Sequence, residues 1–133
     1  MNKITFLLLR LAIGVSLFGH GLVRMPKLDG FSRWMVTSFK DSMLPEFVVL
    51  PFSYILPFLE LIIGFLILVG LFTRQALVAG AVVMIALILG STLIESWEAV
   101  SVQLIHVAFL AGLFHFSKAN AISFDSLLRH NAA

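Results

Sequence analysis

The sequence predicts an all-α protein: a four-helix transmembrane bundle with a short amphipathic surface helix between the first and second spans. Of the 133 residues, 60% are hydrophobic and 12% are charged, whereas soluble domains have about half and about a quarter, respectively. The apolar residues are gathered in four runs, each long enough to cross a hydrocarbon core of about 30 Å at about 1.5 Å per residue. We expect residues 1–133 to form a single membrane domain in contact with the lipid bilayer.

The four spans are expected at about residues 4–23, 49–72, 76–94 and 99–116. Arg24 and Lys27 follow the first apolar run and end it. Thr73, Arg74 and Gln75 are expected to form the tight turn between the second and third spans. A connection this short makes those two helices antiparallel neighbours.

Two segments outside the spans are expected to lie on the membrane surface. In residues 28–46, charged side chains alternate with aromatic ones, and Phe31, Trp34, Met35 and Ser38 fall at helical spacing. This pattern predicts the amphipathic helix, with Trp34 among the lipid head groups. The tail, residues 117–133, is polar and is expected to lie along the surface as well.

Charge favours an orientation with both termini in the cytoplasm. Basic residues divide almost evenly between the two sides, so their count decides little. The loop between the second and third spans is purely basic, however, and the loop between the third and fourth is purely acidic. The first of these loops lies on the side of the termini, which is therefore the expected cytoplasmic side.

Composition also excludes several functions. The chain has no cysteine, which removes thiol redox chemistry, iron–sulfur ligation and Cys-ligated zinc. It has no glycine-rich nucleotide-binding motif. Its net charge of +2 comes from scattered residues rather than from a basic patch interleaved with aromatics, so we expect no nucleic-acid partner.

Ionisable side chains within the spans mark the candidate site, because each costs at least about 2 to 3 kcal/mol there unless it finds a partner. Counted from the cytoplasmic edge, the polar residues of three spans lie at roughly 15 to 24 Å. Side chains lean toward the N-terminus of their own helix, so those of the first span lean toward those of the other two. We therefore predict a buried polar cluster of His20, Arg24, Glu60, Gln103 and His106.

This cluster has two interpretations. As interhelical glue it fixes the register of the bundle, at about 0.6 to 2 kcal/mol per hydrogen bond. As a site, His20, Glu60 and His106 exchange protons or bond a ligand head group, while Arg24 and Gln103 bind the same ligand. Two histidines and a carboxylate could also hold a metal, or the histidines could ligate haem axially, but each needs a geometry that the sequence does not show, and we predict no metal site.

Two further ionisable residues are expected to be structural. Arg10 lies at roughly 9 Å from the cytoplasmic edge and leans toward it, so we expect its side chain to snorkel to the head groups. His115 ends the fourth span and is expected at the interface.

Three stretches resemble the DoxX family of small bacterial membrane proteins: LLRLAIGVSLFGHGLVR, LPFLELIIGFLILVGLFTR and the tail segment ISFDSLL. One departure is visible, because the family commonly has Lys where this chain has Arg24. Arginine keeps the charge but is not a titratable amine, so we expect no proton transfer at that position. The strongest elements of the resemblance are Arg10, Gly14, His20 and Gly21 in the first span, Pro57, Glu60, Gly64, Gly70, Thr73 and Arg74 across the second, and Ser123 and Asp125 in the tail.

The resemblance implies a four-helix bundle in the bacterial inner membrane. Some relatives serve as subunits of thiosulfate:quinone oxidoreductase or associate with other membrane redox proteins. By analogy it implies a quinone-linked redox role, with quinone as the cofactor and another membrane or membrane-associated redox protein as the partner.

Three functions follow from these observations. The first is a quinone-linked subunit or accessory of a membrane oxidoreductase, whose electrons must come from elsewhere. The second is a non-catalytic membrane anchor or assembly partner. The third, a small-solute transporter, is disfavoured because the chain has no internal repeat and no pair of broken helices.

Overall fold

The computed structural model describes residues 1–133 and contains helices and turns but no strands, which confirms the all-α class. Four of the helices, α1, α3, α4 and α5, are long and apolar enough to cross a membrane, as the sequence predicts. The elements in order are α1 (Lys3–Arg24), the 3₁₀ turn η1 (Met25–Lys27), α2 (Leu28–Ser38), α3 (Glu46–Val69), α4 (Thr73–Leu93), α5 (Trp97–His115), the 3₁₀ turn η2 (Ser117–Ala119) and α6 (Phe124–Ala132).

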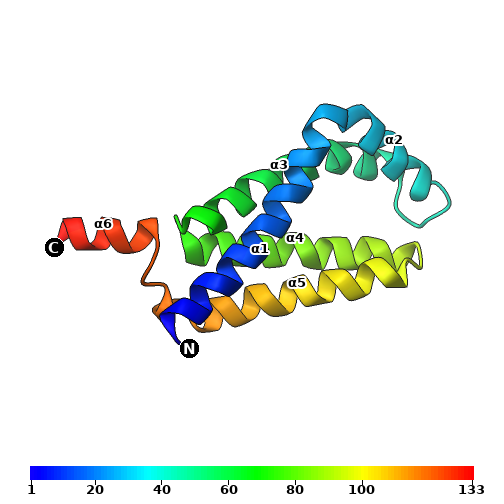
Figure 1. The fold of residues 1–133 in the computed structure, drawn as a ribbon. Coiled ribbons are helices and arrows are strands. Elements are labelled where there is room, and N and C mark those ends of the chain that lie inside the picture. Colours follow the sequence, from blue (N-terminus) through cyan, green and yellow to red (C-terminus); the bar gives the residue numbers. More distant parts are fainter.

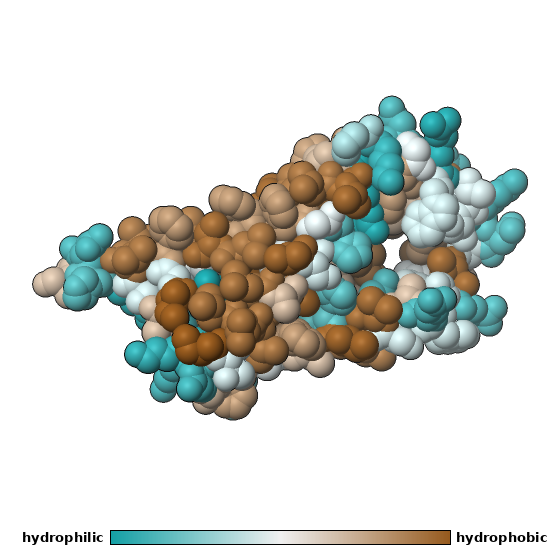
Figure 2. All heavy atoms as spheres, viewed as in Figure 1, coloured by the Kyte–Doolittle hydropathy of each residue, from teal (hydrophilic) through white to brown (hydrophobic).

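The bundle is built from two helix pairs. Helix α1 packs chiefly on α3, and α4 packs chiefly on α5. Both termini lie at one end of the bundle, and α2 lies at the other end (Figure 1). Much of the outer face is apolar (Figure 2), with Val15, Phe65 and Val82 each at least half exposed, as expected for side chains that face lipid.

Helix α2 confirms the amphipathic helix expected after the first span. It buries Ser32 and Met35 against α3, and the Ser32 hydroxyl is hydrogen-bonded to that of Ser53 at 2.7 Å. Trp34, beside Met35, is 60% exposed. The helix therefore buries one face against the bundle and leaves this aromatic side chain accessible.

Helices α1 and α3 meet backbone to backbone at two glycines. A Cβ atom on Gly21 would lie 2.5 Å from the Leu61 nitrogen and 2.6 Å from the Pro57 oxygen. Gly64 is placed in the same way against the backbone of Phe18. No other residue type fits at either position, which is the close approach that small residues permit between membrane helices.

The turn between α3 and α4 lies three residues before the predicted one. Gly70 ends α3 with φ of 71°, and Phe72 also has a positive φ, 48°. Thr73 then begins α4, so the prediction of a turn at residues 73–75 is wrong. The polar residues suggested a loop, but the hydrogen-bond acceptor that allows a helix to start at Thr73 comes from the distant tail.

That acceptor is the carboxylate of Asp125, which caps the first turn of α4. Its Oδ1 accepts from the Phe72 backbone N–H and its Oδ2 from that of Thr73, each at 2.8 Å. The backbone N–H of Asp125 in turn donates to the Gly70 carbonyl at 2.9 Å. Anions are favoured at helix N-termini, where N–H groups lack partners. The tail therefore stabilises a turn whose conformation is unfavourable for Phe72.

The tail also buries Arg10, so the expectation for Arg10 is wrong and the expectation of a surface-lying tail is wrong for the start of the tail. Arg10 does not snorkel: it is 3% exposed, and its Nη1 donates to Asn120 Oδ1 at 2.6 Å and to the Ile122 carbonyl at 2.9 Å. Asn120, 5% exposed, also donates to Thr73 Oγ1 at 3.0 Å. The start of the tail is thus inserted into the end of the bundle rather than lying on its surface, because the guanidinium needs buried acceptors.

The glycine contact generates the first prediction. Gly21→Ala should lower the stability of the bundle by about 1 to 3 kcal/mol, because the added methyl group collides with backbone that cannot move aside. Gly19→Ala is the matched control, since nothing lies within 4 Å of a Cβ at that position. Thermal unfolding of the two variants in the same detergent checks the prediction, and equal melting temperatures would contradict it.

The Asp125 cap generates a pH-dependent prediction. Burial raises the pKa of the Asp125 carboxyl, but the hydrogen bonds from Thr73 and Phe72, together with the charge of Arg129, outweigh it and hold the pKa below its ordinary value. The carboxylate therefore stabilises the fold above the unfolded-state pKa of about 3.9, and this contribution is lost as the pH falls through the folded-state pKa.

We expect Asp125→Asn to melt below the wild-type protein at pH 7, with the gap narrowing as the pH is lowered past about 4. Asp41→Asn serves as the control, because Asp41 is exposed in the loop between α2 and α3. It should differ little from wild type at any pH. A gap for Asp125→Asn that is the same at all pH values would show that the charge does not form the cap.

Candidate functional site

A cavity of about 630 Å³ lies between α1, α2 and α3 on one side and α4 and α5 on the other. It is at the end of the bundle that carries α2, where the space-filling view shows the molecule hollowed (Figure 2). Its volume falls within the range of about 300 to 1,000 Å³ typical of small-molecule sites. Apolar side chains form most of its wall, among them Leu17, Met35, Phe39, Phe52, Leu56 and Met84.

The five residues of the predicted polar cluster all line this cavity: His20, Arg24, Glu60, Gln103 and His106. They come from three helices that are distant in sequence, α1, α3 and α5. The structure thus brings together the residues that depth and side-chain direction placed at one level of the bundle. Of the five only Glu60 is buried and His20 is exposed, so the prediction that the cluster is buried is wrong, because the cavity opens beside these side chains. The cavity is the candidate site.

Arg24 and Glu60 form an ion pair on one wall of the cavity. Arg24 Nη1 lies 2.5 Å from Glu60 Oε2, and the two side chains are 23% and 4% exposed. The Arg24 guanidinium also lies over the Phe31 ring, 4.4 Å from its centroid, a cation–π contact. Arg24 therefore connects α1 to both α3 and α2 beside the cavity.

His20 and His106 lie edge to face, with ring centroids 6.2 Å apart. In each ring Nδ1 lies near the carbonyl oxygen four residues earlier: the Ser16 oxygen at 2.6 Å for His20 and the Val102 oxygen at 2.9 Å for His106. A carbonyl oxygen only accepts, so each Nδ1 carries the hydrogen. In the neutral imidazole each Nε2 then carries a lone pair.

Two serines complete the site, and sequence reasoning missed both. Ser16 Oγ donates to His106 Nε2 at 2.8 Å and joins α1 to α5. Ser91 Oγ accepts from Gln103 Nε2 at 2.9 Å and joins α4 to α5. The available signal was position: Ser16 is one helical turn before His20, and both serines interrupt apolar runs. Gln103 Oε1 is buried and has no hydrogen-bond partner.

The remaining candidates lie elsewhere. His115 is at the end of α5, with its ring edge-on to that of Phe116 and the two ring centroids 4.7 Å apart. It is not among the residues that line the cavity. No three His, Asp or Glu side chains are grouped so as to hold a metal ion.

Comparison with known protein families assigns the greater part of the chain. The family model DoxX matches residues 5–94, which cover α1 from its third residue through the end of α4. The chain belongs to the DoxX family. No curated protein and no solved structure matches it. Gln103, His106 and the tail lie beyond the residues that the DoxX model matches.

The residues that carry the DoxX resemblance gather at two places in the fold. One is the cavity wall with its glycine contact, where His20, Gly21, Glu60 and Gly64 lie. The other is the opposite end, which the tail closes. Arg10, Gly70, Thr73, Ser123 and Asp125 meet there.

The ion pair generates a prediction about stability. Arg24→Leu should destabilise the protein by about 3 kcal/mol or more, because Glu60 is left buried and unpaired. Glu60→Leu should cost less, because Arg24 is partly exposed and keeps its contact with Phe31. The double variant should recover part of the loss of Arg24→Leu. Melting temperatures of the three variants in detergent test this, and a double variant less stable than Arg24→Leu would contradict it.

Proposed function

We propose that this DoxX protein is a quinone-linked subunit or accessory of a membrane oxidoreductase, and that the cavity binds the quinone. One observation carries the proposal: a largely apolar cavity inside a membrane bundle is lined by an Arg24–Glu60 ion pair and by the adjacent rings of His20 and His106. A lipid-soluble redox ligand requires apolar contact for its tail and ring together with a few polar groups for its oxygens.

The residues present fit such a ligand. Phe39, Phe52 and Leu56 offer apolar contact, and Arg24 and Ser91 carry N–H or O–H groups that can donate to an oxygen. The buried Gln103 Oε1 without a partner indicates an amide whose polar requirements the chain alone does not meet. A bound quinone supplies two-electron, two-proton chemistry.

The chain's own contribution is to position the ligand and to hold protons. His20 and His106 donate their Nδ1 hydrogens to backbone carbonyls, so Nε2 is the atom left for proton exchange in each ring. In His106 this atom also accepts from the Ser16 hydroxyl. Histidine is the side chain most often used for proton transfer in active sites, which suits this exchange. Glu60, beside Arg24, is the third proton-exchanging group that we propose, with Arg24 and Gln103 binding the ligand.

Electrons must reach the cavity from a partner, because the chain has neither cysteine nor a nucleotide-binding motif. We further propose that residues 1–133 are one domain of the bacterial inner membrane with both termini cytoplasmic. An even number of spans places the termini on one side, and Arg74, in the first turn of α4, is on that side. The cavity, at the α2 end, then opens toward the periplasmic side.

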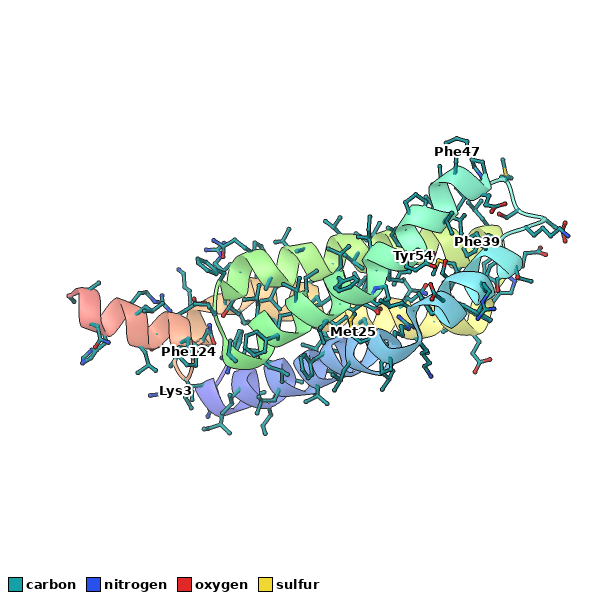
Figure 3. All side chains as sticks on the ribbon, turned by 90° about the horizontal axis from the view of Figure 1, so that it is seen from above. Lys3, Met25, Phe39, Phe47, Tyr54 and Phe124 are labelled. Carbon is teal, nitrogen blue, oxygen red and sulfur yellow. The ribbon has the colours of Figure 1, made fainter.

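One observation supports the alternative of a non-catalytic assembly partner. Helix α6 extends away from the bundle, beginning at Phe124 (Figure 3). It leaves Phe124, Leu127 and Leu128 more than half exposed, and their i, i+3, i+4 spacing places them on one face of the helix. Such a face fits another protein as well as it fits the membrane surface.

His20→Gln and His106→Gln test the proposal. Glutamine replaces one imidazole hydrogen bond but cannot titrate near neutral pH. We therefore expect both variants to fold and quinone-dependent turnover in membranes to fall by about 100-fold. His115→Gln is the matched control, because His115 is outside the cavity.

The measurements are the melting temperature, the quinone content of the gently purified protein and the turnover of the intact membrane system. Variants of His20 and His106 that are both fully stable and fully active would remove the cavity from consideration as a redox site. A loss of stability with turnover unchanged would assign the histidines to interhelical packing.

A further inference from the structure

The balance of hydrogen-bond donors and acceptors on the cavity wall determines which redox form of a quinone it binds more tightly. The oxidised form of a quinone has carbonyl oxygens and only accepts hydrogen bonds. The reduced form has hydroxyl groups and donates them. Which form binds more tightly therefore depends on whether the wall offers lone pairs or hydrogens.

His20 offers a lone pair. Its Nδ1 hydrogen is donated to the Ser16 carbonyl at 2.6 Å, within the same helix, so turning the ring over would break this bond and leave the carbonyl without it. The neutral ring therefore keeps Nε2 unprotonated. His20 is exposed and lines the cavity, which makes Nε2 available to a ligand. His106 differs, because the Ser16 hydroxyl already occupies its Nε2.

Glu60 offers a second acceptor. Its Oε2 is bonded to Arg24, and an ionised carboxylate has a further oxygen that only accepts. Glu60 also lines the cavity. Arg24 is the charged donor on this wall, but its guanidinium is directed to Glu60 and covers Phe31. His20 and Glu60 thus both present lone pairs to the cavity, and Glu98, which also lines it, adds a further carboxylate.

We propose that the cavity binds the reduced, dihydroxy form of an aromatic redox lipid in preference to its oxidised form, with a hydroxyl donating to His20 Nε2 and Glu60 as the second acceptor. This inference rests on the proposed function, since it concerns the same cavity. It goes further by assigning the redox state of the ligand and the atom that selects it.

Binding of three probes tests the inference: a short-chain benzoquinone, its dihydroxy form kept reduced without oxygen, and an aliphatic alcohol of the same length. Trp34 lines the cavity, so the quenching of tryptophan fluorescence reports occupancy in the full-length protein in detergent. We expect the dihydroxy form to bind about tenfold tighter than the oxidised form, the effect of one hydrogen bond to a well-placed acceptor.

Variants identify the selecting atom. In His20→Gln the side-chain amide can turn to donate or to accept, so the preference for the reduced form should disappear. In the control His115→Gln it should remain. If His20→Gln fails to fold, the comparison of the two redox forms on the wild-type protein decides by itself.

Each other outcome overturns the inference in a distinct way. Equal or tighter binding of the oxidised form overturns it and leaves the proposed quinone site standing. Binding of the aliphatic alcohol as tight as that of the dihydroxy form shows that the cavity selects a lipid alcohol rather than a redox head group. Binding of none of the three probes rejects the proposed function and the inference together.

Discussion

The backbone contact between α1 and α3 is the constraint on which the rest of the bundle depends. Gly21 and Gly64 remove the side chains that would hold the helices apart. The close approach places Arg24 within hydrogen-bond distance of Glu60, and Arg24 then reaches Phe31 on α2. One wall of the cavity is therefore a consequence of two missing side chains, since a wider spacing would leave the Glu60 carboxylate without its partner.

The two ends of the bundle differ in packing, because one encloses a cavity and the other is filled by the tail. At the α2 end the helices diverge around a cavity whose polar groups are only partly satisfied, as the buried Gln103 Oε1 shows. At the other end the tail fills the space, and Asn120 and Asp125 accept hydrogen bonds from buried donors of α1 and α4, with only Arg10 Nε left without a partner. A hydrogen-bonded, closed end supports the scaffold, and the polar groups at the other end remain available to a ligand.

The fold class, the four spans, the surface helix and the membership of the polar cluster could be predicted from the sequence, because hydropathy, helical spacing and depth are local properties. The turn at Gly70 and the burial of Arg10 could not. Both depend on hydrogen bonds with Asp125 and Asn120, which are distant in sequence. No local pattern indicates which helices these two side chains contact. The roles of Ser16 and Ser91 were not predicted either, because no sequence pattern distinguishes a serine that forms a hydrogen bond within an apolar run from a serine that is only a tolerated small residue.

The burial of Arg10 has a consequence for how the chain is made. Its hydrogen-bond partner Asn120 is 110 residues later in the sequence, so during synthesis the first span enters the membrane with a cation that has no acceptor yet. The same late segment brings the carboxylate that caps α4. We expect the nascent protein to remain loosely assembled until residues 120–125 have left the ribosome, and chains that stop before these residues to be recognised by quality control as unfinished.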